Sequence, residues 1–325
     1  MRLLPMLMLL VTALAVFSLG IGNESISLAD AVSASFSGSG AVSAIILQEI
    51  RLPRMLIAAF AGATLGLTGA AMQGLLRNPL ASPGLVGSAS GAALGAVSVL
   101  YFTLAWHPQL VPLAGMVGAL LATSLVYLLA GRDASVTTLI LAGVAINALA
   151  AAGLSLLLNL APSPYAVQEL VLWTLGDIAD RSMDDFWLML PCTALSWLML
   201  IGIGPKLNAL TLGERTAQSL GINSQWLRWR VFIAVSLGVG SAVATTGMIG
   251  FIGLVVPHLL RPLTGHEPGR LLPASALGGA AMLLSADIGV RLIPTETALK
   301  VGVLTALVGT PFFLFLILKS RKAYI

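Results

Sequence analysis

The protein has 325 residues, of which 58% are hydrophobic and only 9% are charged. An ordinary soluble domain carries about 25% charged residues, so this composition excludes one and indicates an integral membrane protein. The formal net charge is +4, and the single Cys192 excludes a disulfide framework and a cysteine-rich metal site.

Apolar stretches of roughly 20 residues, long enough to cross about 30 Å of hydrocarbon, follow one another along the chain. They lie near residues 3–21, 52–75, 84–105, 110–130, 136–160, 186–204, 271–290 and 299–318. The first also resembles a signal peptide, but no small-x-small cleavage motif follows it, so we expect a retained span. A further run from Val231 to Leu263 is too long for one span and is interrupted by glycines, and hydropathy alone does not divide it.

The distribution of charge predicts the topology, because cytoplasmic loops collect Lys and Arg. If the run from Val231 to Leu263 is a hairpin, the chain crosses the membrane about ten times and both termini are cytoplasmic. Twelve of the seventeen Lys and Arg residues then lie inside, and ten of the thirteen Asp and Glu residues lie outside. The predicted fold class is therefore an all-α polytopic membrane protein, a single transmembrane domain over residues 1–325.

The middles of the predicted spans contain no Lys, Arg, Asp or Glu. Carriers driven by a proton gradient usually need an ionisable relay within the membrane, so this class of transporter is disfavoured. The three histidines are scattered over both sides, no nucleophile and base can be paired, and no phosphate-binding loop is present. We therefore predict no catalytic residue, no metal site and no enzyme, and we expect Gln73, Asn147 and Asn159 to form interhelical hydrogen bonds.

The polar stretch "LTLGERTAQSLGIN" lies in a predicted cytoplasmic segment. Thr211 and Glu214 have the spacing of a capping box, and Gly221 supplies a left-handed helix stop. These signals predict a helix of two to three turns over residues 211–221. An interfacial helix lying on lipid and a docking helix both fit this pattern, and the small apolar face favours docking.

The sequence resembles the permease subunits of ATP-binding-cassette importers for iron chelates and cobalamin. The resemblance covers nearly the whole chain and is carried by "RLPRMLIAAFAGATLGLTGAAMQGLLRNPLASPGLVG", "LILAGVAIN", "LTLGERTAQSLGIN", "GFIGLVVPHLLR", "RLLPASALGGAAMLLSADIGVRL" and "VGVLTALVGTPFF". It implies ten helices per subunit, a dimer of permeases, and a coupling helix that enters a cleft on a cytoplasmic ATPase. The segment "WTLGDIADRSMDD" is least similar to the family.

The resemblance also implies three groups of functional residues. The residues that contact the ATPase would be Glu214, Arg215, Thr216, Ala217, Gln218, Leu220 and Gly221. Asn78 and Leu80, in "RNPLASPG", would close the inner gate, with Thr137 in a second gate region; the residues alone also fit a proline-rich turn.

Arg51, Arg54 and Arg291 would dock an outer binding protein that presents a carboxylate on each of two lobes. The motif "RLPR" places Pro53 in the first turn of a span. Two arginines would then lie at the positive end of a helix dipole, at an expected cost of about 0.3 to 1 kcal/mol each. Neutralisation by Glu49 and lipid phosphates is the alternative role for these arginines.

The function predicted from this resemblance is the inner-membrane permease of an ATP-driven importer of an iron chelate, either a ferric siderophore or haem. A cobalamin permease of the same family, an ion-gradient-driven carrier and an intramembrane transferase are the alternatives. The expected partners are a second permease, identical or related, two ATPase subunits, a substrate-binding protein and membrane lipid, with no nucleic acid. We expect no cofactor in this chain, because the partner ATPase would use the ATP and Mg²⁺.

Overall fold

The computed structural model describes residues 3–22, 27, 32–33, 42–102, 106–107, 109–131, 136–293 and 299–322. The described part is helical and contains no strand. The elements in chain order are α1 (Leu3–Gly20), α3 (Val42–Ile45), the π-helix η1 (Ile46–Arg51), α4 (Leu52–Leu76), η2 (Pro83–Val86), α5 (Ser88–Tyr101), α6 (Leu110–Ala130), α7 (Val136–Asn159), α8 (Pro164–Thr174), α9 (Met183–Leu200), α10 (Gly204–Thr211), α11 (Glu214–Ser219), α12 (Ser224–Thr246), α13 (Ile252–Leu260), η3 (Pro262–Thr264), α14 (Pro268–Leu292) and α15 (Val301–Lys322).

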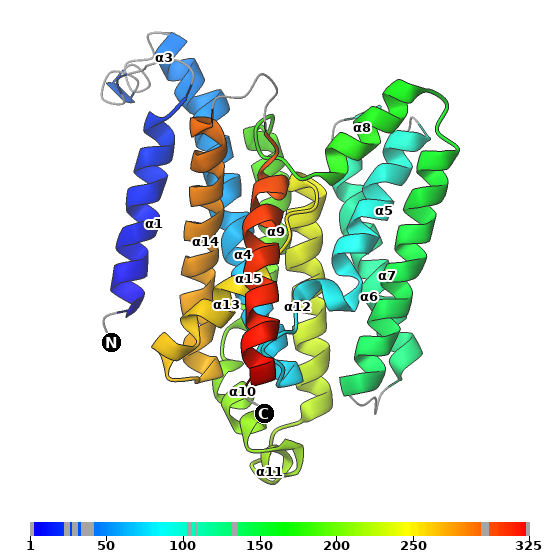
Figure 1. The fold of residues 1–325 in the computed structure, drawn as a ribbon, viewed down its shortest axis with the longest axis vertical. Helices are drawn as coiled ribbons and strands as arrows, with labels where there is room; N and C mark the ends of the chain where they lie inside the picture. Colours follow the sequence, from blue (N-terminus) through cyan, green and yellow to red (C-terminus); the bar gives the residue numbers. More distant parts are fainter. Residues whose placement is uncertain are drawn as a thin grey trace.

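The long helices run in alternate directions between the two ends of the molecule (Figure 1). Within the described residues, six helical stretches are long and apolar enough to cross a membrane: α1, the continuous stretch from α3 to α4, α6, α7, α12 and α14. A seventh forms from α9 and α10, which meet at a bend of 52°. Helix α5 and the stretch Val301–Phe315 of α15 are apolar but shorter, and α13 has only nine residues, so the ten crossings stay a prediction.

The short helix α11 projects from one end of the molecule (Figure 1). Helix α1 begins at this end and α15 finishes at it, which agrees with the prediction that both termini lie on the same side as α11. Lys and Arg gather in the segments at this end, so it is the cytoplasmic end.

The glycine-rich run from Val231 to Leu263 is a hairpin, as predicted. Its first arm belongs to α12, which ends at Thr246. Residues 247–251 then leave the helical path, and the returning arm contains α13, a helix of only nine residues.

The same pattern occurs between α4 and α5. Residues 77–82 are non-helical, and the short helix η2 precedes α5. We call the two helix pairs, α4 with α5 and α12 with α13, each with the non-helical break between its helices, the two broken spans. Helices α4 and α12 run in opposite directions through the molecule (Figure 1), so the two pairs are inverted relative to each other. Such broken spans frame the transport path in many transporters with inverted repeats.

Close backbone contact joins α4 to α14. A Cβ atom on Gly66 would lie 2.0 Å from the carbonyl oxygen of Ser275, and one on Gly62 would lie 2.4 Å from that of Gly279. A second pair with the same small-x-x-x-small spacing, Gly91 and Gly95, faces α6 in the same way. The small-x-x-x-small spacing therefore marks real helix contacts in both places.

This contact predicts the effect of Gly66→Ala. The added methyl group would force α4 and α14 apart, and overpacking of this kind costs about 1 to 3 kcal/mol. We expect a lower thermal unfolding temperature of the purified permease. Gly20→Ala is the matched control, because a Cβ atom there meets nothing within 4 Å; equal unfolding temperatures for the two variants would contradict the prediction.

Candidate functional site

A cavity of about 320 Å³ lies between the two broken spans. Ser82, Pro83 and Gly84 line it from the first break, and residues 248–251 line it from the second. Non-helical backbone is tolerated at membrane depth where it is buried in protein or lines a cavity. The two breaks in the helical path therefore meet at one place.

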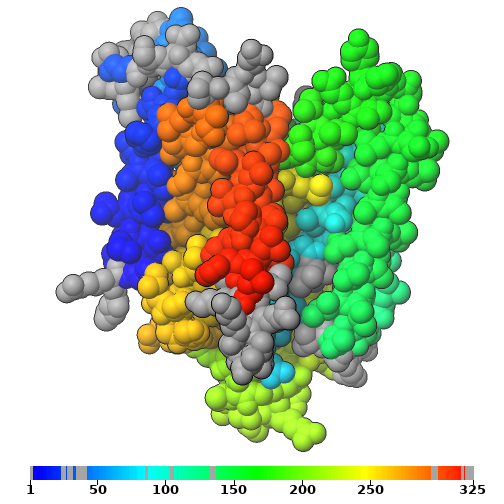
Figure 2. Space-filling view, viewed as in Figure 1, coloured from blue at the N-terminus to red at the C-terminus, as the bar shows by residue number. Residues whose placement is uncertain are grey.

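A second cavity, of about 590 Å³, adjoins the first and shares Met248 and Gly250 with it. Its other walls come from the end of α8 and from α15, through Thr174, Leu175, Gly302, Val303, Ala306, Leu307, Thr310 and Pro311. Figure 2 shows a hollow between α15 in red and the green helices α7 and α8, with yellow and cyan segments at its floor.

No residue that lines either cavity is charged. The walls are made of apolar and small side chains with a few hydroxyl groups, as the lack of ionisable residues in the predicted spans suggested. A route of this kind can pass a large solute without holding it tightly at one point.

The predicted gate residues lie in the loop that follows α4 and leads to Ser82, which lines the first cavity. Asn78 and Leu80 belong to the loop of residues 77–82, which we call the gate loop. The Asn78 side chain accepts a hydrogen bond from Leu80 N at 2.9 Å, and Leu80 is 37% exposed. Thr137, by contrast, is exposed in the first turn of α7.

Helix α7 is tied to the first break by Asn147. Its Nδ2 donates to Gly84 O at 2.9 Å, and its Oδ1 accepts from Ser90 Oγ at 2.8 Å. The prediction of interhelical hydrogen bonds is confirmed for Asn147, whereas Asn159 is exposed at the end of α7 and contacts no other helix through a described hydrogen bond. It is also confirmed for Gln73 between α4 and α13, since its Nε2 donates to Leu254 O at 3.3 Å.

The predicted coupling helix is α11, which is shorter than expected. The capping-box prediction was wrong, because α10 continues through Thr211, whose hydroxyl donates to Asn208 O at 2.6 Å. Gly213 is the N-cap residue, and the Glu214 carboxylate pairs with Arg228 of α12 instead of the backbone. The predicted stop is confirmed: Gly221 has φ +81°.

Most of the predicted ATPase-contact residues are available to a partner. Arg215, Thr216, Gln218, Leu220 and Gly221 are exposed on the projecting helix, and Glu214 is partly exposed. Ala217 differs, because it is fully buried. Its methyl group therefore holds α11 against the permease.

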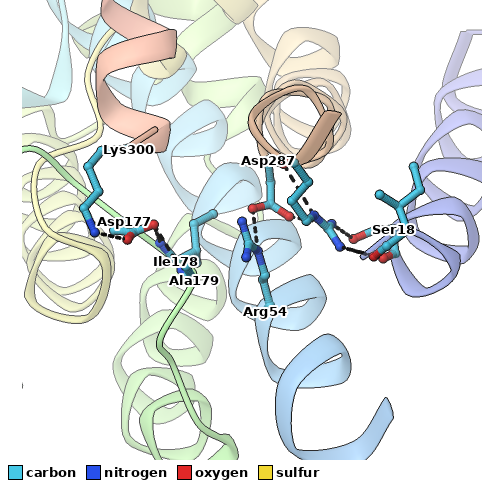
Figure 3. A network of polar contacts seen from close by, with 9 residues as sticks. Ser18, Arg54, Asp177, Ile178, Ala179, Asp287 and Lys300 are labelled. Carbon is cyan, nitrogen blue, oxygen red and sulfur yellow. Dashed lines mark hydrogen bonds and ion pairs between the residues drawn. The ribbon is translucent and has the colours of Figure 1, made fainter. Parts of the chain in front are cut away.

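The three arginines predicted to dock a binding protein lie close together at the outer end of the molecule, and Figure 3 shows Arg54 and Asp287 of this arginine cluster. Asp287 of α14 is fully buried and accepts from Arg54 Nε at 2.8 Å and from Arg291 Nη2 at 2.6 Å. Arg51 is 5% exposed. All three guanidinium groups thus bind partners within this chain.

Arg51 and Arg291 cap the C-terminal end of α1. Arg51 donates to the carbonyl oxygens of Leu19 and Gly20 at 2.9 and 3.1 Å. Arg291 donates to those of Ser18 and Ile21 at 2.8 and 2.9 Å. These carbonyls are among the groups that a helix end leaves unpaired, and cations are favoured there.

The dipole argument from the motif "RLPR" was therefore wrong. The helical path already begins upstream, in α3 and η1, so Arg51 and Arg54 do not lie at a free helix N-terminus. Nothing in the local sequence indicates the upstream π-helix, and the carbonyls that Arg51 meets belong to a segment about thirty positions earlier.

One more ion pair on the outer side was not indicated by the sequence. Lys300, just before α15, pairs with Asp177 in the turn between α8 and α9 (Figure 3). The Asp177 carboxylate also accepts from the backbone of Ile178 and Ala179. Asp177 lies within "WTLGDIADRSMDD", the segment least similar to the family, so the resemblance carried no signal for it.

No group of three or more His, Cys, Asp or Glu side chains suited to a metal ion occurs within the described residues.

Comparison with known proteins agrees with this architecture. The model of the FecCD transport family matches residues 9–319. The chain belongs to this family. It is 38% identical over 326 residues to the Fe(3+)-citrate import system permease protein YfmE of Bacillus subtilis, an alignment that covers 98% of this chain and 97% of the relative.

Other relatives are named for different solutes. The hemin transport system permease protein HmuU of Yersinia pestis is 40% identical, with 85% of this chain and 84% of the relative covered. The vitamin B12 import system permease protein BtuC of Vibrio cholerae is 39% identical, with 89% and 87% covered. A solved inward-facing structure of a metal-chelate type ABC transporter superposes with a TM-score of 0.85 at 32% identity, over 98% of this chain and 99% of that one.

This chain is therefore a multi-pass inner-membrane permease subunit of an ATP-binding-cassette importer. Its family consists of transport subunits, and the prediction that the chain is not an enzyme is consistent with that membership.

The arginine cluster predicts the effect of Asp287→Ala. Removing this buried carboxylate leaves Arg54 and Arg291 facing each other without a counter-charge, and breaking a buried ion pair costs about 3 to 5 kcal/mol. We expect a large loss of thermal stability, together with faster proteolysis after α1. Asp184→Ala removes an exposed outer carboxylate and is the control; similar stability of the two variants would count against the assignment.

Proposed function

We propose that this permease imports an iron chelate, either a ferric siderophore or haem, which a binding protein delivers at the outer end. A partner ATPase docks on α11 and supplies the energy from ATP and Mg²⁺. The observation that carries the proposal is the uncharged route between the two broken spans, with the gate loop at its inner end and α11 exposed beyond it.

A second permease subunit would complete the wall of this route. The hollow between α15 and α7 is open on one side (Figure 2). Large apolar side chains are exposed on both helices, among them Leu141, Val144, Leu307 and Val308. A second copy of this chain, or a related permease, would cover such surface, with lipid around the rest.

A cobalamin permease is the second candidate, because vitamin B12 permeases are among the relatives at 39% identity. An ion-gradient-driven carrier is disfavoured by the uncharged walls of the two cavities. Uptake into vesicles containing the ATPase, tested with ferric siderophores, haem and cobalamin, distinguishes these functions. Uptake that needs internal ATP and survives an uncoupler supports the importer, and uptake of cobalamin alone would overturn the iron-chelate proposal.

Substitutions on α11 should uncouple the permease from its ATPase. Gln218→Lys changes an exposed contact residue, and Gly221→Val disfavours the left-handed stop by about 1 kcal/mol or more. We expect normal membrane levels and reduced co-purification of the ATPase. Gln168→Lys, the same change at an exposed position of α8, is the control; unchanged co-purification in both α11 variants would refute the docking role.

Docking of a binding protein on Arg51, Arg54 and Arg291 belongs to the same proposal. It requires these side chains to exchange an internal contact for a partner carboxylate. We expect Arg54→Gln to slow association of the binding protein at low salt and to have little effect at high salt, because steering by charge is screened. The association rate is measured at both salt concentrations beside the unfolding temperature. A rate that is unchanged in a stably folded variant would exclude Arg54 from docking.

A further inference from the structure

Asn208 joins the helix before α11 to the start of α14. Its Nδ2 donates to Glu267 Oε1 at 2.8 Å, and its Oδ1 accepts from Gly269 N at 2.7 Å. Pro268 has no N–H group, and the N-cap residue Glu267 makes no side-chain cap. The N–H of Gly269 is thus the first backbone donor of α14, and the Asn208 side chain of the neighbouring helix α10 caps it.

Tight packing surrounds this amide. Leu207 is fully buried, and a Cβ atom on Gly74 of α4 would lie 3.1 Å from its Cδ1. A Cβ atom on Gly204 would lie 2.9 Å from the Cα of Gly269. Helix α10 is therefore seated directly on the inner ends of α4 and α14.

Hydrogen bonds continue from this contact to the gate loop. The turn before α14 closes on Arg261, because His266 N donates to Arg261 O at 3.0 Å. Arg261 Nη2 donates to Gln73 Oε1 at 2.5 Å. The backbone oxygen of Gln73 accepts from Asn78 N at 3.2 Å, where the gate loop begins.

We propose that Asn208 is a positioning residue that transmits movement of α11 to the gate loop. This inference rests on the proposed function, in which α11 receives the ATPase. The main contacts of α11 are with α10 and α12. Of these two helices, α10 is the one whose contacts lead to the inner ends of both α14 and α4. Hydrogen bonds have preferred directions, so the two hydrogen bonds of the Asn208 amide fix the orientation of α10 on α14. The apolar contact of Leu207 alone would leave that orientation free.

An exchange of donor and acceptor tests the role of this amide. Asn208→Asp keeps an acceptor for Gly269 N but places a second carboxylate against Glu267. Adding Glu267→Gln restores a donor and acceptor pair with the roles reversed. Arg270 pairs with Glu267 Oε2 at 2.6 Å, and in the double variant it can still donate to the side-chain oxygen of the introduced glutamine. Asn159→Asp, at an exposed position that ends α7, is the matched control for the single change.

The measurement follows the gate loop and needs no identified substrate. A permease carrying Cys192→Ser and Leu80→Cys is purified with its ATPase, and the maleimide labelling rate is compared with and without ATP and vanadate. We expect nucleotide trapping to change the rate about fivefold or more, the lower range of coupling between sites. Asn208→Asp should lose most of this change while still trapping nucleotide, and the double variant should regain it.

Three results would overturn the inference. The first is a full change of labelling rate in Asn208→Asp, and the second is no recovery in the double variant. The third is loss of the ATPase from Asn208→Asp, because the amide would then hold the docking surface itself. If the parent permease retained no ATPase at all, the proposed function would fail, and this inference would fail with it.

Discussion

Hydrocarbon offers no partner to a backbone N–H or C=O group, and this constraint shapes the whole molecule. Most of the chain meets it by forming continuous helices. The two broken spans meet it by tertiary hydrogen bonds: Asn147 of α7 donates to Gly84 O, and Asp177 N donates to Thr246 O, at the end of α12, at 2.7 Å. Because these bonds come from neighbouring elements, the breaks are possible only inside the assembled bundle, where they surround the two uncharged cavities.

Helix ends pose the same problem at the membrane surfaces, and arginines solve it on both sides. Arg51 and Arg291 donate to the last carbonyls of α1 at the outer end. At the inner end, Arg230 of α12 donates to Met199 O and Ile201 O, where α9 terminates. Arg230 lies on the cytoplasmic side, so it both contributes to the orientation of the chain and caps a neighbouring helix.

Asp287 gives the outer cluster its geometry. One buried carboxylate is shared by Arg54 and Arg291, so α4 and α14 are tied together at the outer end, where glycine contacts bring them close along their length. Two guanidinium groups remain in excess of the single carboxylate.

The sequence by itself determined the fold class, the long apolar spans, the position of the termini and the existence of α11, because hydropathy, loop charge and a glycine stop act over short distances along the chain. It also indicated close contact at Gly62 and Gly66. Only the tertiary structure decided which side chains Glu214, Arg51 and Asp287 meet. Glu214 fits a capping box locally, yet Arg228 of the next helix is a stronger, charged partner. Asn208 carried no signal in the sequence, because its two partners lie 59 and 61 positions further along the chain and are brought to it only when α10 packs on α14.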